Sequence, residues 1–175
     1  MSLINTQIKP FKATAYHDGE FVEVTDATLK GKWSVVVFYP ADFTFVCPTE
    51  VVGFGRRLSE FEALDAQVLG VSVDDVETHR AWAAELGGVP FPLLSDPKRE
   101  VCLAYEVLNP VEQRAWRATI IVSPEGKIAY QVVSPMNVGR SVEETLRVLG
   151  ALATGRLCPA DWKPGQPTLD PHLRY

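Results

Sequence analysis

The sequence predicts an α/β fold in which helices flank a central β-sheet. The residues from Trp33 to Tyr39 form an almost wholly apolar, valine-rich run, which is typical of a strand covered on both faces. An amphipathic stretch follows from about Cys47 to Ala66 and leads into a second apolar segment, Val68–Val73. Together the three segments predict a βαβ unit. Further β-type segments lie on both sides of this unit, and no internal repeat interrupts the pattern.

Turn and capping residues predict the elements on either side of the βαβ unit. Asp18-Gly19 separates the segments Phe11–Tyr16 and Phe21–Thr25, and this dipeptide predicts an N-terminal β-hairpin. After the unit, Asp74-Asp75 predicts the start of a helix, which Gly87-Gly88 ends before a short apolar segment, Phe91–Leu94.

The second half of the chain predicts two strands between two helices. Asp96-Pro97 predicts a helix from about Lys98 to Tyr105. Pro124-Glu125-Gly126 predicts a turn between strands at Arg117–Val122 and Lys127–Val133. The run Ser141-Val142-Glu143-Glu144 has the spacing of a capping box, and an apolar stripe at helical spacing follows it.

The end of the chain has a different composition. Four prolines after Gly155 preclude regular structure there: Pro159, Pro164, Pro167 and Pro171. We therefore expect one domain over residues 1–155 and an irregular, mobile tail over residues 156–175 that carries Cys158.

Composition excludes several classes of function. The net charge of −5 and the lack of a basic block argue against a nucleic-acid-binding protein. The N-terminus has no leader-like pattern, and no run approaches the roughly 20 apolar residues of a membrane span, so we expect a cytosolic protein. The three cysteines form no CxxC pair and no cluster with the three histidines, so we expect no metal site.

Cys47 lies where the predicted strand turns into the predicted helix. Unpaired N–H groups and the positive end of the helix dipole favour an anion at this position, so the thiolate should be stabilised and reactive. Pro48 suits the first helical turn, because the N–H that proline lacks would have had no partner there. Cys102 has core-like spacing and is expected to be an inert, partly buried thiol.

The chain resembles the typical two-cysteine peroxiredoxins, the group that includes the bacterial alkyl hydroperoxide reductase C proteins. The similarity covers nearly the whole length and rests on six motifs in the family's order. They are Phe38-Tyr39-Pro40 through Cys47-Pro48-Thr49-Glu50, His79-Arg80-Ala81-Trp82, Ser95-Asp96-Pro97-Lys98-Arg99, Arg117-Ala118-Thr119, Val138-Gly139-Arg140-Ser141 and Cys158-Pro159-Ala160-Asp161-Trp162. The resemblance implies a thioredoxin-like fold with an N-terminal hairpin extension, and a thiol-dependent peroxidase without metal, haem or flavin.

The resemblance also implies roles for the site residues. The family's Pro-x-x-x-Thr-x-x-Cys motif falls on Pro40, Thr44 and Cys47, and its distant arginine falls on Arg117. Cys47 would attack a peroxide oxygen and become a sulfenic acid, while Arg117 stabilises the thiolate and the leaving oxygen. The Thr44 hydroxyl and the Cys47 N–H would help to hold the peroxide, and Pro40 would exclude water.

Glu50 and Arg140 resemble the family's supporting residues: a carboxylate between two guanidiniums would orient Arg117. By itself, Glu50 would be an ordinary first-turn acid, and Thr44 and Pro40 would be ordinary turn residues. His79 and Trp82 are expected to pack or cap.

Cys158 matches the resolving cysteine, whose thiol would condense with the sulfenic acid of a partner subunit to form an intersubunit disulfide. The implied assembly is an antiparallel homodimer, commonly in rings of five dimers. The first turn around Cys47 and the tail would rearrange locally to form this bond. A flavoprotein, thioredoxin or a lipoyl-linked adaptor would each be compatible as the disulfide reductase.

The sequence departs from the family's pattern at two places, and two alternative functions stay open. Many relatives have Gly-Gly-Leu-Gly where this chain has Gly87-Gly88-Val89-Pro90, and some end in a Tyr-Phe helix where this sequence ends in Leu173-Arg174-Tyr175. A tail without that helix should unfold readily, so overoxidation to sulfinic acid should be slow. The alternatives are a thiol-disulfide exchange protein, which the absence of CxxC weakens, and a ring-shaped holdase chaperone that would not need Cys47.

Overall fold

The computed structural model describes residues 2–172, so the terminal Leu173-Arg174-Tyr175 lies outside the described residues. The backbone divides into two compact units, Met1–Arg140 and Ser141–Tyr175. The second unit thus contains the last helix as well as the tail. The division into domains at residue 155 remains a prediction.

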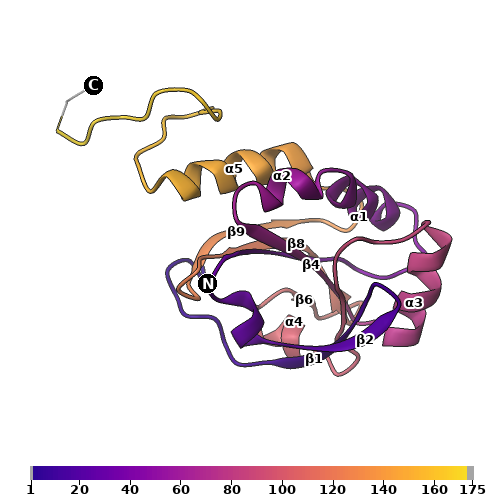
Figure 1. Ribbon diagram of the computed structural model, residues 1–175. Coiled ribbons are helices and arrows are strands. Elements are labelled where there is room, and N and C mark those ends of the chain that lie inside the picture. The colour runs from indigo at the N-terminus through magenta and orange to yellow at the C-terminus, as the bar shows by residue number, and fades with distance from the viewer. Residues whose placement is uncertain (1, 173–175) are drawn as a thin grey trace. The chain divides into compact units, whose positions relative to one another are not determined.

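The first unit is built on a seven-stranded mixed sheet with the order β2-β1-β5-β4-β3-β8-β9 (Figure 1). Its strands pair in parallel from β3 to β4 and from β4 to β5, and antiparallel elsewhere. The bounds are β1 Lys12–His17, β2 Glu20–Thr25, β3 Trp33–Phe38, β4 Ala66–Ser72, β5 Leu93–Ser95, β8 Arg117–Val122 and β9 Ile128–Ser134. The βαβ unit and the N-terminal hairpin are confirmed.

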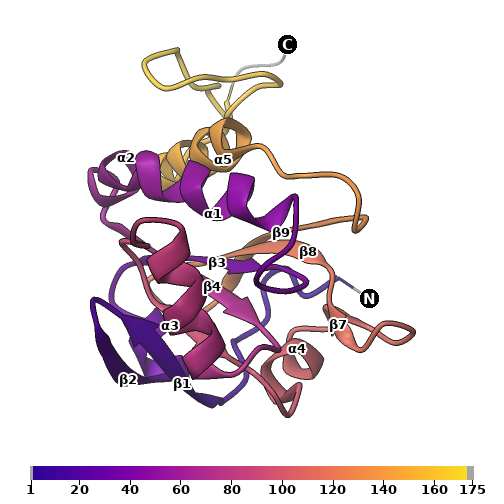
Figure 2. The ribbon, with the colours of Figure 1, turned by 90° about the vertical axis from the view of Figure 1, so that its right-hand side faces the viewer.

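The helices of this unit lie on both faces of the sheet. Helices α1 (Cys47–Arg56) and α2 (Leu58–Glu62) cover one face, and α4 (Glu100–Ala104) lies on the other (Figures 1 and 2). On the α4 side, alternate residues of β3 such as Val36 and Phe38 belong to the main core cluster, together with Cys102. Helix α3 (Val76–Glu85) contacts β1 and β5.

Two predicted helices differ from those observed, and three short elements were not predicted. The helix expected to run from Cys47 to Ala66 is broken at Arg57, whose backbone leaves the helical region at φ −109° and ψ 14°. The helix after Asp96-Pro97 begins later, because Asp96 itself accepts the N–H groups of Val101 and Cys102 at 3.1 and 2.8 Å. A short 3-10 helix, η1 (Asp26–Leu29), and a two-stranded ribbon, β6 (Leu108–Asn109) with β7 (Arg114–Ala115), were not predicted.

Two predicted helix starts are confirmed, and in each the side chain of the residue just before the helix accepts an N–H group of the first turn. Asp75 accepts the N–H of Thr78 at the start of α3, and Ser141 accepts the N–H of Glu144 at the start of α5 (Val142–Thr154). The second half of the expected capping box is replaced, because the carboxylate of Glu144 pairs with Arg147 instead.

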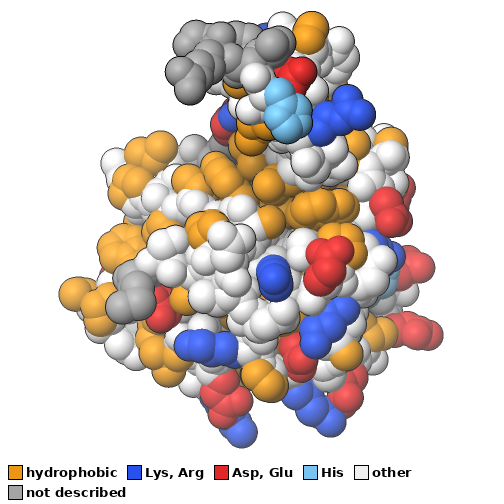
Figure 3. All heavy atoms as spheres, turned by 90° about the vertical axis from the view of Figure 1, so that its left-hand side faces the viewer, with side chains coloured by type: hydrophobic (Ala, Val, Ile, Leu, Met, Phe, Trp, Pro, Cys, Tyr) orange, Lys and Arg blue, Asp and Glu red, His pale blue; other side chains and the backbone are white. Residues whose placement is uncertain are grey.

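The surface and the helices give a few further facts. Acidic and basic side chains are interspersed on the face drawn in Figure 3. None of the helices within residues 2–172 is long and apolar enough to cross a membrane. In the same range, no group of three or more His, Cys, Asp or Glu side chains is placed to hold a metal ion.

Candidate active site

Cys47 is the first residue of α1, as the sequence predicted. It follows the loop of residues 39–46, which leaves the end of β3, and its side chain is completely buried. Pro48 lies in the first helical turn, and the Thr49 hydroxyl donates to the carbonyl of Val46 at 2.6 Å. The Thr49 and Glu50 N–H groups also donate to the Val46 carbonyl, so the helix start presents the positive end of its dipole beside a thiol that solvent does not reach.

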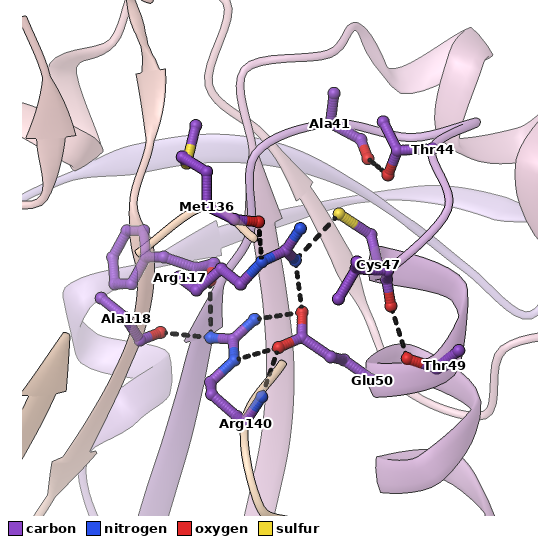
Figure 4. Close-up of polar contacts among 11 residues, drawn as sticks. Ala41, Thr44, Cys47, Thr49, Glu50, Arg117, Ala118, Met136 and Arg140 are labelled. Atoms are coloured by element: carbon purple, nitrogen blue, oxygen red, sulfur yellow. Dashed lines mark hydrogen bonds and ion pairs between the residues drawn. The ribbon is translucent and has the colours of Figure 1, made fainter. Parts of the chain in front are cut away.

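Arg117 contacts the thiol from the neighbouring strand. It is the first residue of β8, and the antiparallel register of β8 with β3 pairs Ala118 with Phe38. This register brings Arg117 beside the start of the loop, and its Nη1 donates to Cys47 Sγ at 3.2 Å (Figure 4). The Nε of Arg117 donates to the carbonyl of Met136 at 2.7 Å, which fixes the plane of the guanidinium.

Glu50 lies between two guanidiniums one turn along α1. Arg117 Nη1 donates to Glu50 Oε2 at 2.8 Å. Arg140 Nε and Nη2 donate to the two carboxylate oxygens at 2.9 and 3.0 Å, so the forked contact is made by Arg140 rather than by Arg117. Arg140 also donates to the carbonyls of Phe38 and Ala118, both at 2.6 Å. The carboxylate therefore fastens α1 to the ends of β3 and β8.

The site has an excess of positive charge when the thiol is protonated. Arg117, Arg140 and Glu50 are all nearly inaccessible to solvent, so two cations share one carboxylate away from water. Burial alone would raise the pKa of Glu50, but the hydrogen bonds and charge of Arg140 and the charge of Arg117 outweigh it and lower this pKa. An anionic sulfur at Cys47 would balance the remaining guanidinium.

Thr44 and Pro40 lie in the loop before Cys47. The Thr44 hydroxyl donates to the carbonyl of Ala41 at 3.1 Å, which leaves its oxygen lone pairs available as acceptors. In the view of Figure 4, Thr44 and Arg117 lie on opposite sides of the Cys47 sulfur. Pro40 is buried and Thr44 is half-buried. The structure therefore places Arg117 against the Cys47 sulfur, with Thr44 on the opposite side of this sulfur in that view and Pro40 buried in the same loop.

Cys158 lies in the second unit and is partly exposed. Its sulfur is near the Thr154 hydroxyl at 3.6 Å and the carbonyl of Ala151 at 3.9 Å. The tail around it is irregular, as predicted, but internal contacts order it. The carbonyl of Trp162 accepts from Arg147 on α5 at 3.1 Å, and only 4% of the Trp162 surface is exposed.

Cys102 is buried in the core on the α4 side of the sheet. Burial raises the pKa of its thiol strongly, and the negative charge of Asp96 raises it further. The expectation of an inert, buried thiol agrees with this environment.

Sequence reasoning missed one feature next to the site. His79 is completely buried, in agreement with the packing role expected for it, but it is also paired with Asp42 in the loop before Cys47. Asp42 is the only charged residue between Tyr39 and Thr49, and this was the signal that could have pointed to the pair.

Comparison with known proteins gives one consistent result. Residues 4–131 match the model of the AhpC/TSA family. Alkyl hydroperoxide reductase C of Pseudomonas aeruginosa (strain UCBPP-PA14) is 42% identical over 181 residues, which cover 99% of this chain and 97% of that protein. The crystal structure of Enterococcus faecalis AhpC superposes with a TM-score of 0.87 at 39% identity, covering 91% of this chain and 100% of that chain.

The reduced 2-Cys peroxiredoxin of Plasmodium vivax superposes with a TM-score of 0.92 at 33% identity, covering 98% of this chain and 94% of that chain. These similarities extend over both units of the chain. They confirm the thioredoxin-like fold class and the resemblance inferred from the motifs. The chain belongs to the AhpC/TSA family and is a peroxiredoxin, an enzyme that reduces peroxides with a cysteine thiol.

Proposed function

We propose that Cys47 is the nucleophile of this peroxidase and that its substrates are hydrogen peroxide and small organic hydroperoxides. The observation that carries the proposal is the 3.2 Å contact between Arg117 Nη1 and Cys47 Sγ at the start of a helix. A cation and the positive end of the helix dipole both favour the thiolate, which is the reactive form.

The geometry supports an in-line displacement. The thiolate attacks one peroxide oxygen, the O–O bond breaks, and the negative charge passes to the leaving oxygen, which takes up a proton as water or alcohol. Arg117, which already bonds the sulfur, also stabilises this developing charge. The Thr44 hydroxyl and the Cys47 N–H orient the peroxide, and the buried Pro40 keeps water from the sulfur.

Glu50 and Arg140 position the nucleophile and its cation. The carboxylate accepts from both guanidiniums, so Arg117 cannot turn away from the sulfur without losing a buried, charged hydrogen bond. Neither Glu50 nor Arg140 bonds the sulfur, so their effect on the reaction passes through Arg117.

Cys158 of a partner subunit then resolves the sulfenic acid. Its thiol attacks the sulfenic sulfur, an S–S bond forms, and the oxygen leaves as water. A dithiol reductase returns both cysteines to the thiol form; a flavoprotein, thioredoxin and a lipoyl-linked adaptor each have the chemistry to do so.

Two surface features support the proposed assembly. Strand β9 is an edge of the seven-stranded sheet, and such an edge can pair with the same strand of a second copy to form an antiparallel dimer. Phe45 is 98% exposed and Phe43 is 51% exposed in the loop before Cys47, which supports a further apolar contact between dimers, as in a ring of five.

The test is non-reducing electrophoresis after one equivalent of peroxide, on the wild type and on Cys158→Ser. We expect a disulfide-linked dimer only in the wild type. A disulfide within one monomer would reject resolution between subunits. A Cys158→Ser variant in which peroxide leaves Cys47 unoxidised, as measured by mass spectrometry, would reject the proposed nucleophile.

A further inference from the structure

The hydroxyl of Thr154 contacts the sulfur of Cys158, and the chemistry proposed above gives this residue no role. Thr154 is the last residue of α5, and the next residue, Gly155, has a φ of 63°, in the left-handed region that glycine adopts without strain. The chain therefore reverses direction, and Cys158 lies against the last turn of α5. Its Sγ is 3.6 Å from Thr154 Oγ1, 3.9 Å from the carbonyl oxygen of Ala151 and 3.8 Å from that of Arg156.

Contacts on both sides of Cys158 hold it in this place. The N–H of Leu169 donates to the carbonyl of Leu157 at 2.7 Å, and the two residues form an isolated β-bridge. On the other side, the side chain of Trp162 is buried. The second unit therefore holds the sulfur beside Thr154 through other residues, so a variant that lacks only the hydroxyl should keep the same backbone.

The hydrogen bonds of Thr154 identify the thiol of Cys158 as a donor. The Thr154 hydroxyl donates its one proton to the carbonyl of Ala151 at 2.7 Å. Its oxygen accepts from the N–H of Arg156 at 3.1 Å, and one further lone pair is left for the S–H group of Cys158. In the reduced, protonated state, the sulfur therefore donates and the hydroxyl accepts.

Loss of the proton from Cys158 changes the effect of each contact. The thiolate is the form that attacks, and it needs hydrogen-bond donors. The carbonyl oxygens of Ala151 and Arg156 can only accept, so they repel an anionic sulfur. The Thr154 hydroxyl can instead rotate about its C–O bond and donate to the sulfur. Of these three contacts, Thr154 is thus the one that can bond both the thiol and the thiolate.

The sulfur of Cys158 is also open to solvent. Cys158 is partly exposed, and together with Ala151, Gly155 and Pro159 it lines a cavity of about 500 Å³ within the second unit. The proton of the thiol can therefore pass to water, and a small reagent can reach the sulfur.

We propose that Thr154 is a catalytic residue of the resolving step, in which its hydroxyl stabilises the Cys158 thiolate from which the attack starts. The thiol releases its proton to water, and the thiolate attacks the sulfenic sulfur of Cys47 of the partner subunit. An S–S bond forms, and the S–O bond breaks to release hydroxide, which takes up a proton to become water. The inference rests on the proposed function, because it takes Cys158 as the resolving cysteine.

The test compares Thr154→Val, which keeps the shape of the side chain, with Thr154→Ser, which keeps a hydroxyl. A hydrogen bond to an anion shifts an equilibrium by about tenfold or more, but a less stabilised thiolate is also the stronger nucleophile, so the rate changes less. At pH 7, Thr154→Val should slow disulfide formation after one equivalent of peroxide by about three- to sixfold, and Thr154→Ser should keep most of the wild-type rate. Acid quenching at successive times, followed by non-reducing electrophoresis, measures this rate.

Labelling of Cys158 by iodoacetamide separates this role from a structural one. The labelling is followed by mass spectrometry in reduced protein that carries Cys47→Ser, so it needs no disulfide. Loss of the stabilised thiolate should slow the labelling in Thr154→Val by a similar factor, whereas a loosened tail would expose the sulfur and speed it. If Thr154→Val does not fold, Thr154→Ala takes its place, because alanine also lacks the hydroxyl and favours the helix.

Thr145 provides a matched control on the same helix. Its hydroxyl donates to the carbonyl of Ser141 at 3.0 Å, the same kind of bond that Thr154 makes with Ala151. This bond lies at the start of α5, at the opposite end of the helix from Cys158. Thr145→Val should therefore leave both disulfide formation and labelling unchanged.

The outcomes separate this inference from the proposed function. Rates that are unchanged or faster in Thr154→Val, not restored in Thr154→Ser, or equally slowed in Thr145→Val would overturn the role of Thr154, although the wild type still formed its disulfide. A wild type that forms no disulfide between Cys47 and Cys158 would overturn the proposed function itself.

Discussion

Cys47 and Cys102 differ in the charge beside them rather than in burial. Both side chains are completely inaccessible to solvent, and both belong to helices of the first unit. Cys47 faces the guanidinium of Arg117. Beside Cys102, the carboxylate of Asp96 accepts the Cys102 N–H, and its charge acts more strongly on the thiol than that of Arg99. Burial beside a net negative charge keeps a thiol protonated, whereas burial beside an unbalanced cation favours the thiolate.

The largest expected effect comes from exchanging each sulfur for oxygen. Cys47→Ser should abolish peroxidase turnover, a loss of at least about a thousandfold, because a serine hydroxyl is not ionised at neutral pH. Cys102→Ser should leave turnover unchanged. Both variants are assayed by consumption of hydrogen peroxide with a dithiol reductant; turnover that survives Cys47→Ser would end the comparison, because the reactive thiol would lie elsewhere.

Removing the cation should make Cys47 resemble Cys102. Arg117→Gln takes away the charge beside the sulfur and should slow the reaction with peroxide by about 10²–10³-fold. The rate is measured by stopped-flow on the reduced protein. Arg99→Gln is the matched control, since Arg99 lies near Cys102 and bonds the carbonyls of Gln113 and Pro97. Equal losses of rate in the two variants would mean that Arg117 affects the stability of the protein rather than the reactivity of the Cys47 sulfur.

The Glu50 carboxylate should make the free energy of unfolding depend on pH. The pKa of Glu50 lies below its ordinary value of 4.5 in the folded state. The ionised carboxylate therefore stabilises the fold fully above pH 4.5, and this stabilisation is lost as the pH falls through the lowered pKa. We expect Glu50→Gln to lower the free energy of unfolding by about 2–3 kcal/mol at pH 7. The difference in free energy of unfolding between this variant and the wild type should become smaller as the pH falls below 4.5, the ordinary pKa of a glutamate.

Urea unfolding at several pH values measures this gap. The control is Glu60→Gln, because Glu60 pairs with Arg57 on the surface and should have little effect. A gap that stays constant down to acid pH would mean that the ionised carboxylate of Glu50 does not stabilise the fold.

The smallest expected effect concerns the carboxylate beside Cys102. Asp96→Asn weakens the hydrogen bonds at the start of α4 and should lower stability by about 1 kcal/mol. Because burial is the larger cause of the raised pKa of Cys102, the thiol should still resist alkylation in the native protein. Iodoacetamide labelling followed by mass spectrometry measures this. Rapid labelling of Cys102 would show that charge alone had kept it unreactive.

Local sequence patterns were sufficient for most of the fold. The valine-rich strand, the Asp-Gly hairpin and the capped helices depend on neighbouring residues, and each was found where it was predicted. The break at Arg57 and the two-residue strands β6 and β7 were not predictable in this way, because a feature of one or two residues is too short to show a hydrophobic period, and element boundaries are poorly defined by pattern.

The site required more than local pattern. Cys47 could be identified from its place before a helix, but no local feature connects it with Arg117; that contact depends on the register of β8 with β3, and the family motifs supplied it. Asp42 and His79 were missed for the same reason, since each looks ordinary until the loop and α3 are brought together. The meeting of Cys47 with Cys158 stays a prediction, because it depends on a second chain.

The unequal sharing of Glu50 by two arginines also has a consequence for the end of the catalytic cycle. If Cys47 leaves this position when the proposed disulfide forms, Arg117 loses its contact with the sulfur and retains as its anionic partner only Glu50, which it shares with Arg140. On reduction, the proposed thiolate would be attracted back to this guanidinium, which would favour the return of the first turn of α1. The cation proposed to activate the sulfur would thus also help to reset the enzyme for the next peroxide.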